Sequence, residues 1–199
     1  MAEDLEAQRA QRRERIRAAL RDPDASVREA AARALERLER RQDLAVLRER
    51  IAAPGAGVRI EALYGLGALG DRSVLPVLVA SLRDPVEDVR VVAVRVLGTL
   101  RDESALSPLT ECLDDASPHV RREAVEALTC FADRRLVPLL RAVLADAEPS
   151  LLGPALRALG ACGDPESEPE IAGYVGHADP AVRAAALDAL AALDEDFRG

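Results

Sequence analysis

Apolar residues recur along this chain at a fixed interval of 31 residues. One column of this pattern contains Val27, Val58, Val89, Val120, Leu151 and Val182. Alanine follows each of these positions by four residues and leucine follows by eight, from Ala31 and Leu35 to Ala186 and Leu190. Because residues at i, i+4 and i+8 share one face of an α-helix, the pattern predicts a half-buried helix in each of six units.

A second apolar column predicts a partner helix upstream in each unit. Its members are Ile16, Leu47, Leu78, Leu109, Leu140 and Ile171, and another apolar residue follows each of them by four positions. The loops between units end in Asp71, Asp102, Asp133 and Asp164. Gly70 and Gly163 precede two of these aspartates and suit the position just after a helix end. Each unit is therefore expected to be an antiparallel helical hairpin.

Such a hairpin cannot bury its apolar faces alone, so the units must stack with one continuous core. The sequence thus predicts an all-α fold, an α-solenoid of about six 31-residue hairpins with about twelve helices. We expect a single domain over residues 1–199. Its units lie near residues 3–40, 41–71, 72–102, 103–133, 134–164 and 165–195.

One unit departs from this pattern. Gly153 and Pro154 fall in the first turns of the expected downstream helix of the fifth unit. Proline inside a helix forfeits a backbone hydrogen bond, so we expect a kink or a late helix start there. A local change of curvature, a hinge and an opening for a ligand are all compatible with this feature.

Composition narrows the functional classes. The formal charge is −8 and all 27 basic residues are arginine, a usage that codon bias in a GC-rich genome explains. An acidic chain without tryptophan is a poor candidate for a nucleic-acid binder. The charged N-terminal sequence is unlike a secretory signal and no apolar run is long enough to span a membrane, so we expect a bacterial cytoplasmic protein. The three cysteines form no CxxC pair and fit reduced thiols.

The units resemble a known repeat. The segments "LRDPVEDVRVVAVRVLGTLRDESALSPL" and "GHADPAVRAAALDALAAL" are similar to the short HEAT-like repeat, a variety also found in phycobilisome lyase subunits. The resemblance extends over residues 3 to 195. It implies that the downstream helices line the concave face of the solenoid.

The resemblance also implies a structural ladder, in which an aspartate at the turn and an arginine early in the downstream helix link unit to unit. The matching positions are Asp22 and Arg28, Asp84 and Arg90, and Asp115 and Arg121. Arg59 and Arg183 remain, although their aspartate positions hold Ala53 and His177. In the fifth unit Asp146 is present but Leu152 replaces the arginine.

The catalytic routes known from similar folds find no support in the residues. Iron-dependent HEAT-like hydroxylases carry His-Glu dyads, whereas Val120 follows His119 and Ala178 follows His177. No cysteine stands at zinc-ligand spacing from either histidine. We therefore expect no metal, no cofactor and no catalytic site.

The positions that vary between units indicate where a partner binds. On the downstream helices of the second and third units, apolar residues stand where the first and fourth units are charged. The predicted concave patch consists of Ile60, Tyr64, Val91 and Val92, with Arg33, Arg37, Arg95 and Arg122 at its rim. An exposed apolar patch with a polar rim is typical of a binding surface. Contact of Val91 and Val92 with neighbouring helices, or with crystal or dimer mates, is the alternative.

The sequence therefore predicts a non-enzymatic scaffold or adaptor that binds a protein or peptide with an apolar or acidic anchor in its concave groove. One alternative is a subunit of a bilin-lyase-type enzyme, because similar repeats occur in such subunits. A nucleic-acid-binding solenoid would need an arginine-lined groove strong enough to overcome the net charge.

Overall fold

The computed structural model describes residues 2–146 and 148–195, which form eleven α-helices and no strand. The all-α prediction is confirmed. The helices are α1 (Ala2–Ala19), α2 (Ala25–Ile51), α3 (Ala56–Leu69), α4 (Leu75–Ser81), α5 (Glu87–Leu100), α6 (Leu106–Glu111), α7 (Pro118–Thr129), α8 (Val137–Ala145), α9 (Pro149–Ala161), α10 (Glu168–Ala172) and α11 (Pro180–Glu195).

The chain divides into two compact units, residues 1–52 and 53–199, where the sequence predicted one continuous solenoid. Helix α2 explains the difference, because it joins two helices that the pattern had kept apart. Gly70 and Asp71 form the turn between two repeats, whereas Glu39 and Arg40 stand at the equivalent positions 31 residues earlier. Both favour helix, so α2 continues for 27 residues.

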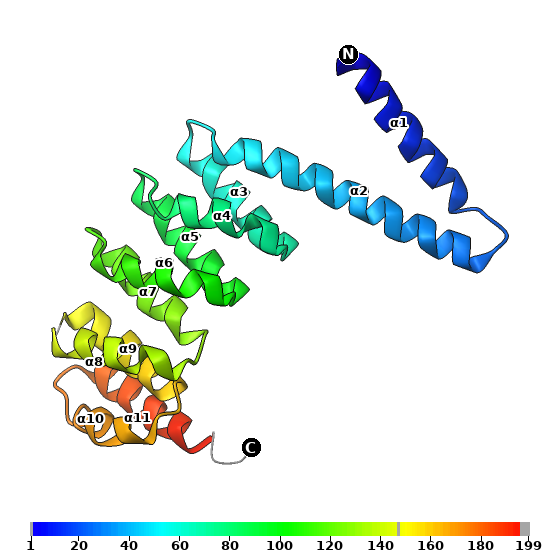
Figure 1. The fold of residues 1–199 in the computed structure, drawn as a ribbon. Coiled ribbons are helices and arrows are strands. Elements are labelled where there is room, and N and C mark those ends of the chain that lie inside the picture. The colour runs from blue at the N-terminus through cyan, green and yellow to red at the C-terminus, as the bar shows by residue number, and fades with distance from the viewer. Residues whose placement is uncertain (1, 147, 196–199) are drawn as a thin grey trace. The chain divides into compact units, whose positions relative to one another are not determined.

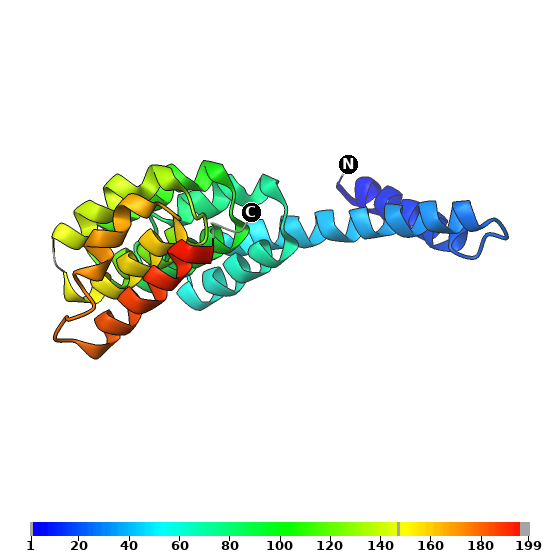
Figure 2. The ribbon, with the colours of Figure 1, turned by 90° about the horizontal axis from the view of Figure 1, so that it is seen from below.

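The second unit consists of stacked helical hairpins (Figures 1 and 2). Its odd-numbered helices α3, α5, α7, α9 and α11, called the odd helices below, contact one another in chain order. Helices α4, α6, α8 and α10 pack against α5, α7, α9 and α11 respectively and form a second layer. This arrangement confirms the predicted α-solenoid for the second unit.

The turns between hairpins repeat one backbone geometry. Asp71, Asp102, Asp133 and Asp164 each accept a hydrogen bond from the backbone N–H two residues further on, at the start of a short 3₁₀ turn. The residue before each aspartate has a left-handed backbone, with φ between 49° and 62°. Glycine meets this need at positions 70 and 163, but Arg101 and Ala132 adopt the same conformation against their intrinsic preference.

The predicted apolar columns form the core of the second unit. Ala62, Ala93, Ala124, Ala155 and Ala186 are all fully buried. Leu66, Leu97, Leu128 and Leu159 are at most 1% exposed. Leu78, Leu109, Leu140 and Ile171 cover them from the other layer and are fully buried too. The continuous core of this unit therefore follows the 31-residue period.

Two glycines allow consecutive odd helices to approach closely. A Cβ atom added to Gly98 of α5 would lie 2.7 Å from the Ala127 Cβ of α7. A Cβ atom added to Gly160 of α9 would lie 2.6 Å from both the Cα and the carbonyl oxygen of Ala189. These distances are too short for any side chain, so packing requires glycine at these two positions.

Helix α9 begins in register with its equivalents. It starts at Pro149, two residues before Leu151, just as α5 and α7 start two residues before Val89 and Val120. The late start predicted from Gly153 and Pro154 is therefore wrong. Pro154 lies inside the helix and is buried. Only the hydrogen bond to the first-turn carbonyl is forfeited, which an otherwise well-packed helix tolerates.

The first unit is a hairpin of α1 and α2 with little burial. Ala31 is the one buried residue among the described side chains from residue 7 to residue 52. A groove of about 620 Å³ runs between the two helices. Arginine dominates the groove lining, with Arg9, Arg12, Arg13 and Arg41.

Candidate interaction surface

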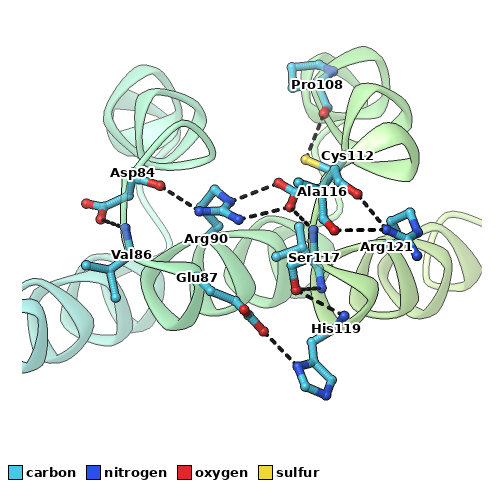
Figure 3. Close-up of polar contacts among 12 residues, drawn as sticks. Asp84, Val86, Glu87, Arg90, Pro108, Cys112, Ala116, Ser117, His119 and Arg121 are labelled. Carbon is cyan, nitrogen blue, oxygen red and sulfur yellow. Dashed lines mark hydrogen bonds and ion pairs between the residues drawn. The ribbon is translucent and has the colours of Figure 1, made fainter.

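The arginine ladder runs along the turns of the second unit (Figure 3). Arg90 of α5 donates one hydrogen bond from Nη1 to the carbonyl oxygen of Asp84 at 2.9 Å, in the turn before its own helix. Its Nε and Nη2 donate to both carboxylate oxygens of Asp115, each at 2.9 Å, in the turn before α7. One guanidinium thus fixes its own turn and the next.

Two more arginines repeat this geometry. Arg59 donates to the carbonyls of Ala53 and Pro54 and, at 2.8 Å, to both carboxylate oxygens of Asp84. Arg121 donates to the Asp115 carbonyl and to the carboxylate of Glu148 at 3.0 and 3.1 Å. Bidentate bonds of this kind are the strongest that arginine makes.

The ladder differs from the prediction in its pairing. The residue six positions before each arginine contributes its backbone carbonyl, and the carboxylate comes from the following repeat. Glu148, two residues beyond the predicted Asp146, supplies the last carboxylate. Among the described residues, Arg28 binds the carbonyls of Asp22 and Pro23 and Arg183 those of His177 and Ala178, with no carboxylate partner for either.

The ladder carboxylates are stabilised in their charged form. Burial alone would raise the pKa of Asp84, but hydrogen bonds from Arg59 and the Val86 N–H, with the nearby guanidinium charges, outweigh burial and lower it. The same balance lowers the pKa of Asp115, where Arg90 is the main partner. Both carboxylates are therefore structural groups that stay ionised.

The predicted patch residues lie on the odd helices. Tyr64 of α3 is 45% exposed, and its hydroxyl accepts a hydrogen bond from Arg95 Nη1 of α5 at 3.3 Å. Arg95 also donates from Nε and Nη2 to the Glu123 carboxylate of α7, at 2.7 and 2.8 Å. The Glu123 bond is the chief reason why the pKa of Arg95 is raised. An exposed tyrosine is thus held in place across three helices.

The structure corrects one member of the patch. Val92 is only 6% exposed, so the expectation that it faces water is wrong. The odd helices pack side by side as well as against the second layer, and this column falls in the side-by-side contact. Ala185 in the same column of α11 lies 3.7 Å from the Cβ position of Gly153 on α9. Val91 and Ile60 are half-buried.

Three of the four predicted rim arginines, Arg33, Arg95 and Arg122, are paired with glutamates. Arg122 pairs with Glu126 at 3.1 Å on α7, and Arg33 pairs with Glu29 on α2. Arg33 and Arg37 belong to the first unit, so the surface described here rests on residues of the second unit alone. We call Ile60, Tyr64, Val91, Arg95 and Glu123 the Tyr64 surface.

Sequence reasoning missed Glu123 as a member of this surface. Glu123 shares its position in the repeat with the apolar Val92. Because this position was judged by its members in all repeats, the charge of Glu123 opposite Arg95 of the preceding helix was missed. A search for opposite charges about one repeat apart on adjacent helices would have found this pair. Glu148 escaped for another reason, because the turn before α9 places its carboxylate two residues later than the period predicts.

The remaining candidates for chemistry are unremarkable. Burial raises the pKa of the Cys112 and Cys162 thiols to about 11, so neither is an activated nucleophile. His119 binds Glu87 at 2.7 Å on the exposed surface. Within the described ranges, no group of three or more potential metal ligands comes together. No described helix is both long and apolar enough to cross a membrane.

Repeated helical hairpins, a turn-to-turn arginine ladder and an exposed helix layer define an α-solenoid of the HEAT class. The profile of the HEAT repeats matches residues 13–90, 75–153 and 137–196. The chain therefore belongs to the HEAT-repeat family. Among curated proteins no sequence matches it.

Solved structures share this fold. The complex of CpcE and CpcF of phycocyanin lyase from Nostoc sp. PCC7120 contains a chain with a TM-score of 0.67 and 24% identity. The match covers 76% of this chain but only 65% of the length of that chain. A designed armadillo repeat protein in complex with the peptide (KR)4 gives a TM-score of 0.57 at 23% identity, over 90% of this chain and 98% of that one.

Proposed function

We propose that this protein is a non-enzymatic interaction module that binds a protein or peptide on the Tyr64 surface. The observation that carries the proposal is the tyrosine itself, which is 45% exposed while its hydroxyl is tethered by Arg95. Tyrosine and arginine are the residue types most enriched at binding hot spots. A tethered side chain also loses little conformational freedom when a partner binds.

The chemistry of this surface favours an apolar anchor. Ile60 lies one helical turn before Tyr64 on α3, Val91 lies one turn before Arg95 on α5, and both are half-buried. Arg95 is already neutralised by Glu123, and the side chain of Glu123 is only 15% exposed. An apolar or aromatic partner side chain can therefore pack on Tyr64, while Arg95 keeps Glu123 paired beneath it. The acidic anchor expected from the sequence finds less support, because Arg95 and Arg122 are both occupied.

The test compares two matched double variants. Tyr64→Glu with Val91→Glu places two carboxylates on the proposed surface, and Ala80→Glu with Ala142→Glu places two on exposed positions of α4 and α8. Capture from the lysate of the source organism should yield a partner with the native chain and the control but not with the Tyr64 variant. Equal helical circular dichroism of all three chains must be established first.

A further variant guards against unfolding. The single substitution Tyr64→Glu changes only an exposed side chain, so it should keep the fold and still weaken capture about tenfold. Equal capture by the native chain and both Tyr64 variants would overturn the proposal.

A subunit of a lyase-type complex is the second candidate. The solved complex of phycocyanin lyase supports it through the shared fold. A coloured species that co-purifies with this chain, or chain-dependent attachment of a bilin to phycocyanin, would favour it over a simple adaptor. Loss of that activity in Tyr64→Glu would connect both candidates to one surface.

A further inference from the structure

Arg183 of α11 is the last ladder arginine among the described residues, and only part of its guanidinium has a partner there. Arg183 donates from Nη1 to the carbonyls of His177 and Ala178 at 2.7 and 2.9 Å, just as Arg59 and Arg121 each bind two carbonyls of their own turns. In Arg90 and Arg121 the Nε and Nη2 atoms bind a carboxylate of the next hairpin. No carboxylate of the described residues occupies this position at Arg183. Its Nε and Nη2 atoms could therefore bind the carboxylate of another chain.

On α11, the face that corresponds to the stacking face of the preceding odd helices is exposed. Leu63, Val94, Val125 and Leu156 stand in one column of the preceding odd helices and are fully buried. Leu187 has the same place on α11 and is 55% exposed. Ala184 and Ala191 flank it and are exposed as well. We call Ala184, Leu187 and Ala191 the tail face, since the equivalent residues of α9, Gly153, Leu156 and Gly160, pack on α11.

The first unit carries the complementary surface. Each odd helix packs against the preceding odd helix through two positions, which on α11 are Ala185 and Ala189. Ala30 and Ala34 stand at the equivalent positions of α2. Val27 beside them is 39% exposed, whereas the equivalent Val89 is 1% exposed. We call Val27, Ala30 and Ala34 the head face.

Asp22 precedes the head face and has the geometry of a ladder carboxylate. Its carboxylate accepts the Asp24 N–H at 2.9 Å, as the carboxylate of Asp84 accepts the Val86 N–H at 2.9 Å. Arg59 completes Asp84, but no arginine among the described residues binds the carboxylate of Asp22. Within the part of the chain that the structure describes, Arg183 therefore lacks the carboxylate and Asp22 lacks the arginine that would complete the ladder.

We propose that copies of this chain associate head to tail, with the tail face of one copy on the head face of a second copy. Arg183 of the first copy then pairs with Asp22 of the second and continues the ladder across the junction. Overall charge favours the same partner. Residues 1–52 hold 13 arginines and 11 acidic residues, whereas residues 53–199 hold 14 arginines and 24 acidic residues. A basic head and an acidic body attract each other.

A contact between two different surfaces does not saturate at a dimer. Each added copy exposes a new tail face, so the assembly grows into short filaments or closes into a ring. Its mass should rise with protein concentration and fall with added salt, because the charge attraction is screened. This inference concerns a surface separate from the Tyr64 surface, so either proposal can fail while the other holds.

The decisive experiment mixes two blocked variants in sedimentation velocity. Leu187→Glu blocks the tail face and keeps the head face. Ala30→Glu blocks the head face and keeps the tail face. Both positions are exposed, so both variants should fold, which circular dichroism verifies. Val46→Glu on α2 is the matched control, because Val46 is 48% exposed and lies outside both faces.

Head-to-tail association makes a specific set of predictions. Native chain and Val46→Glu form oligomers that grow with concentration, whereas Leu187→Glu alone and Ala30→Glu alone sediment as monomers. An equimolar mixture of the two blocked variants forms a dimer and nothing larger, since only one productive junction is possible. The substitution Arg183→Gln should weaken association of the native chain about tenfold.

Three results would overturn the proposal. The first is a native chain that stays monomeric up to several hundred micromolar. The second is dimerisation of Ala30→Glu alone, which would mean that two tail faces bind each other. The third is a monomeric mixture of the blocked variants beside an oligomeric native chain.

Discussion

The hairpin α1–α2 and the stacked unit α3–α11 carry the same apolar period but are held together differently. Val27, Ala31 and Leu35 repeat the pattern of Val89, Ala93 and Leu97. Val89 is 1% exposed, whereas Val27 is 39% exposed. The apolar period therefore specifies the helices and their inner faces, whereas stacking depends on additional positions.

Three features at such additional positions differ between the hairpin and the stack. Gly98 and Gly160 allow close approach in the stack, and Glu36 occupies their column on α2. The Gly70–Asp71 turn has Glu39 and Arg40 as its counterpart. The carboxylate that Arg28 would need is replaced by Ala53. The first unit thus has neither the glycine nor the turn pair of the stack, and the ladder carboxylate expected for Arg28 is absent from the sequence.

The ladder gives the largest expected contrast between the units. Arg90→Met leaves the half-buried Asp115 carboxylate and a turn carbonyl without their donor, so the free energy of unfolding should fall by about 2 to 4 kcal/mol. Arg28→Met removes only exposed bonds to carbonyls and should cost less than about 1 kcal/mol. Urea unfolding of both variants measures the difference, and equal losses would show that the ladder adds nothing to the stack.

Close helix approach gives the next effect. Gly160→Ala forces a Cβ against the backbone of α11 and should lower the free energy of unfolding by about 2 kcal/mol. Gly57→Ala on α3 is the matched control, since nothing lies within 4 Å of its Cβ position. A helical alanine there should stabilise the chain by about 0.5 kcal/mol. A neutral Gly160→Ala would mean that α9 and α11 are packed less tightly than described.

The ladder carboxylates make stability depend on pH in the acid range. Because the pKa of Asp115 is lowered in the folded state, its contribution is complete above the unfolded pKa of about 4 and is lost as the pH falls through the folded pKa. Asp115→Asn should remove about 1 kcal/mol at pH 7 and flatten the decline below pH 4. Unfolding free energies from pH 7 to pH 2 test this, and parallel curves for both chains would contradict it.

The fused helix can be broken by restoring the missing turn. Glu39→Gly with Arg40→Asp recreates the pair found at positions 70 and 71 inside α2. The glycine costs about 1 kcal/mol of helix stability, and the aspartate can cap the following turn. Backbone chemical shifts should then show a helix end near residue 39. A continuous helix in the variant would show that neighbouring residues, and not the turn pair, set the length of α2.

The smallest expected effect is a gain. Ala132→Gly relieves a left-handed backbone that alanine tolerates poorly, so stability should rise by about 0.5 to 1 kcal/mol. The same substitution at Ala142, which lies inside α8, should destabilise by about 1 kcal/mol. Thermal melts of both variants should therefore shift in opposite directions.

Much of the fold could be predicted from the period alone, because each column keeps one environment from hairpin to hairpin. The division of the chain could not, since it depends on the absence of a turn signal near residue 39 and not on any apolar position. The burial of Val92 was missed because helix periodicity marks the side facing the second layer and ignores contacts between neighbouring odd helices. The ladder arginines were found, but their carboxylates lie in the following unit.

Hydrogen exchange of the intact chain measures whether the second unit is more stable internally than the first. Backbone amides of α5, α7 and α9 should exchange only through global unfolding, because the core, the glycine contacts and the ladder protect them jointly. Amides of α1 and of the first half of α2 should exchange at least about a hundredfold faster through local opening. Equal protection of α2 and α7 would contradict the account.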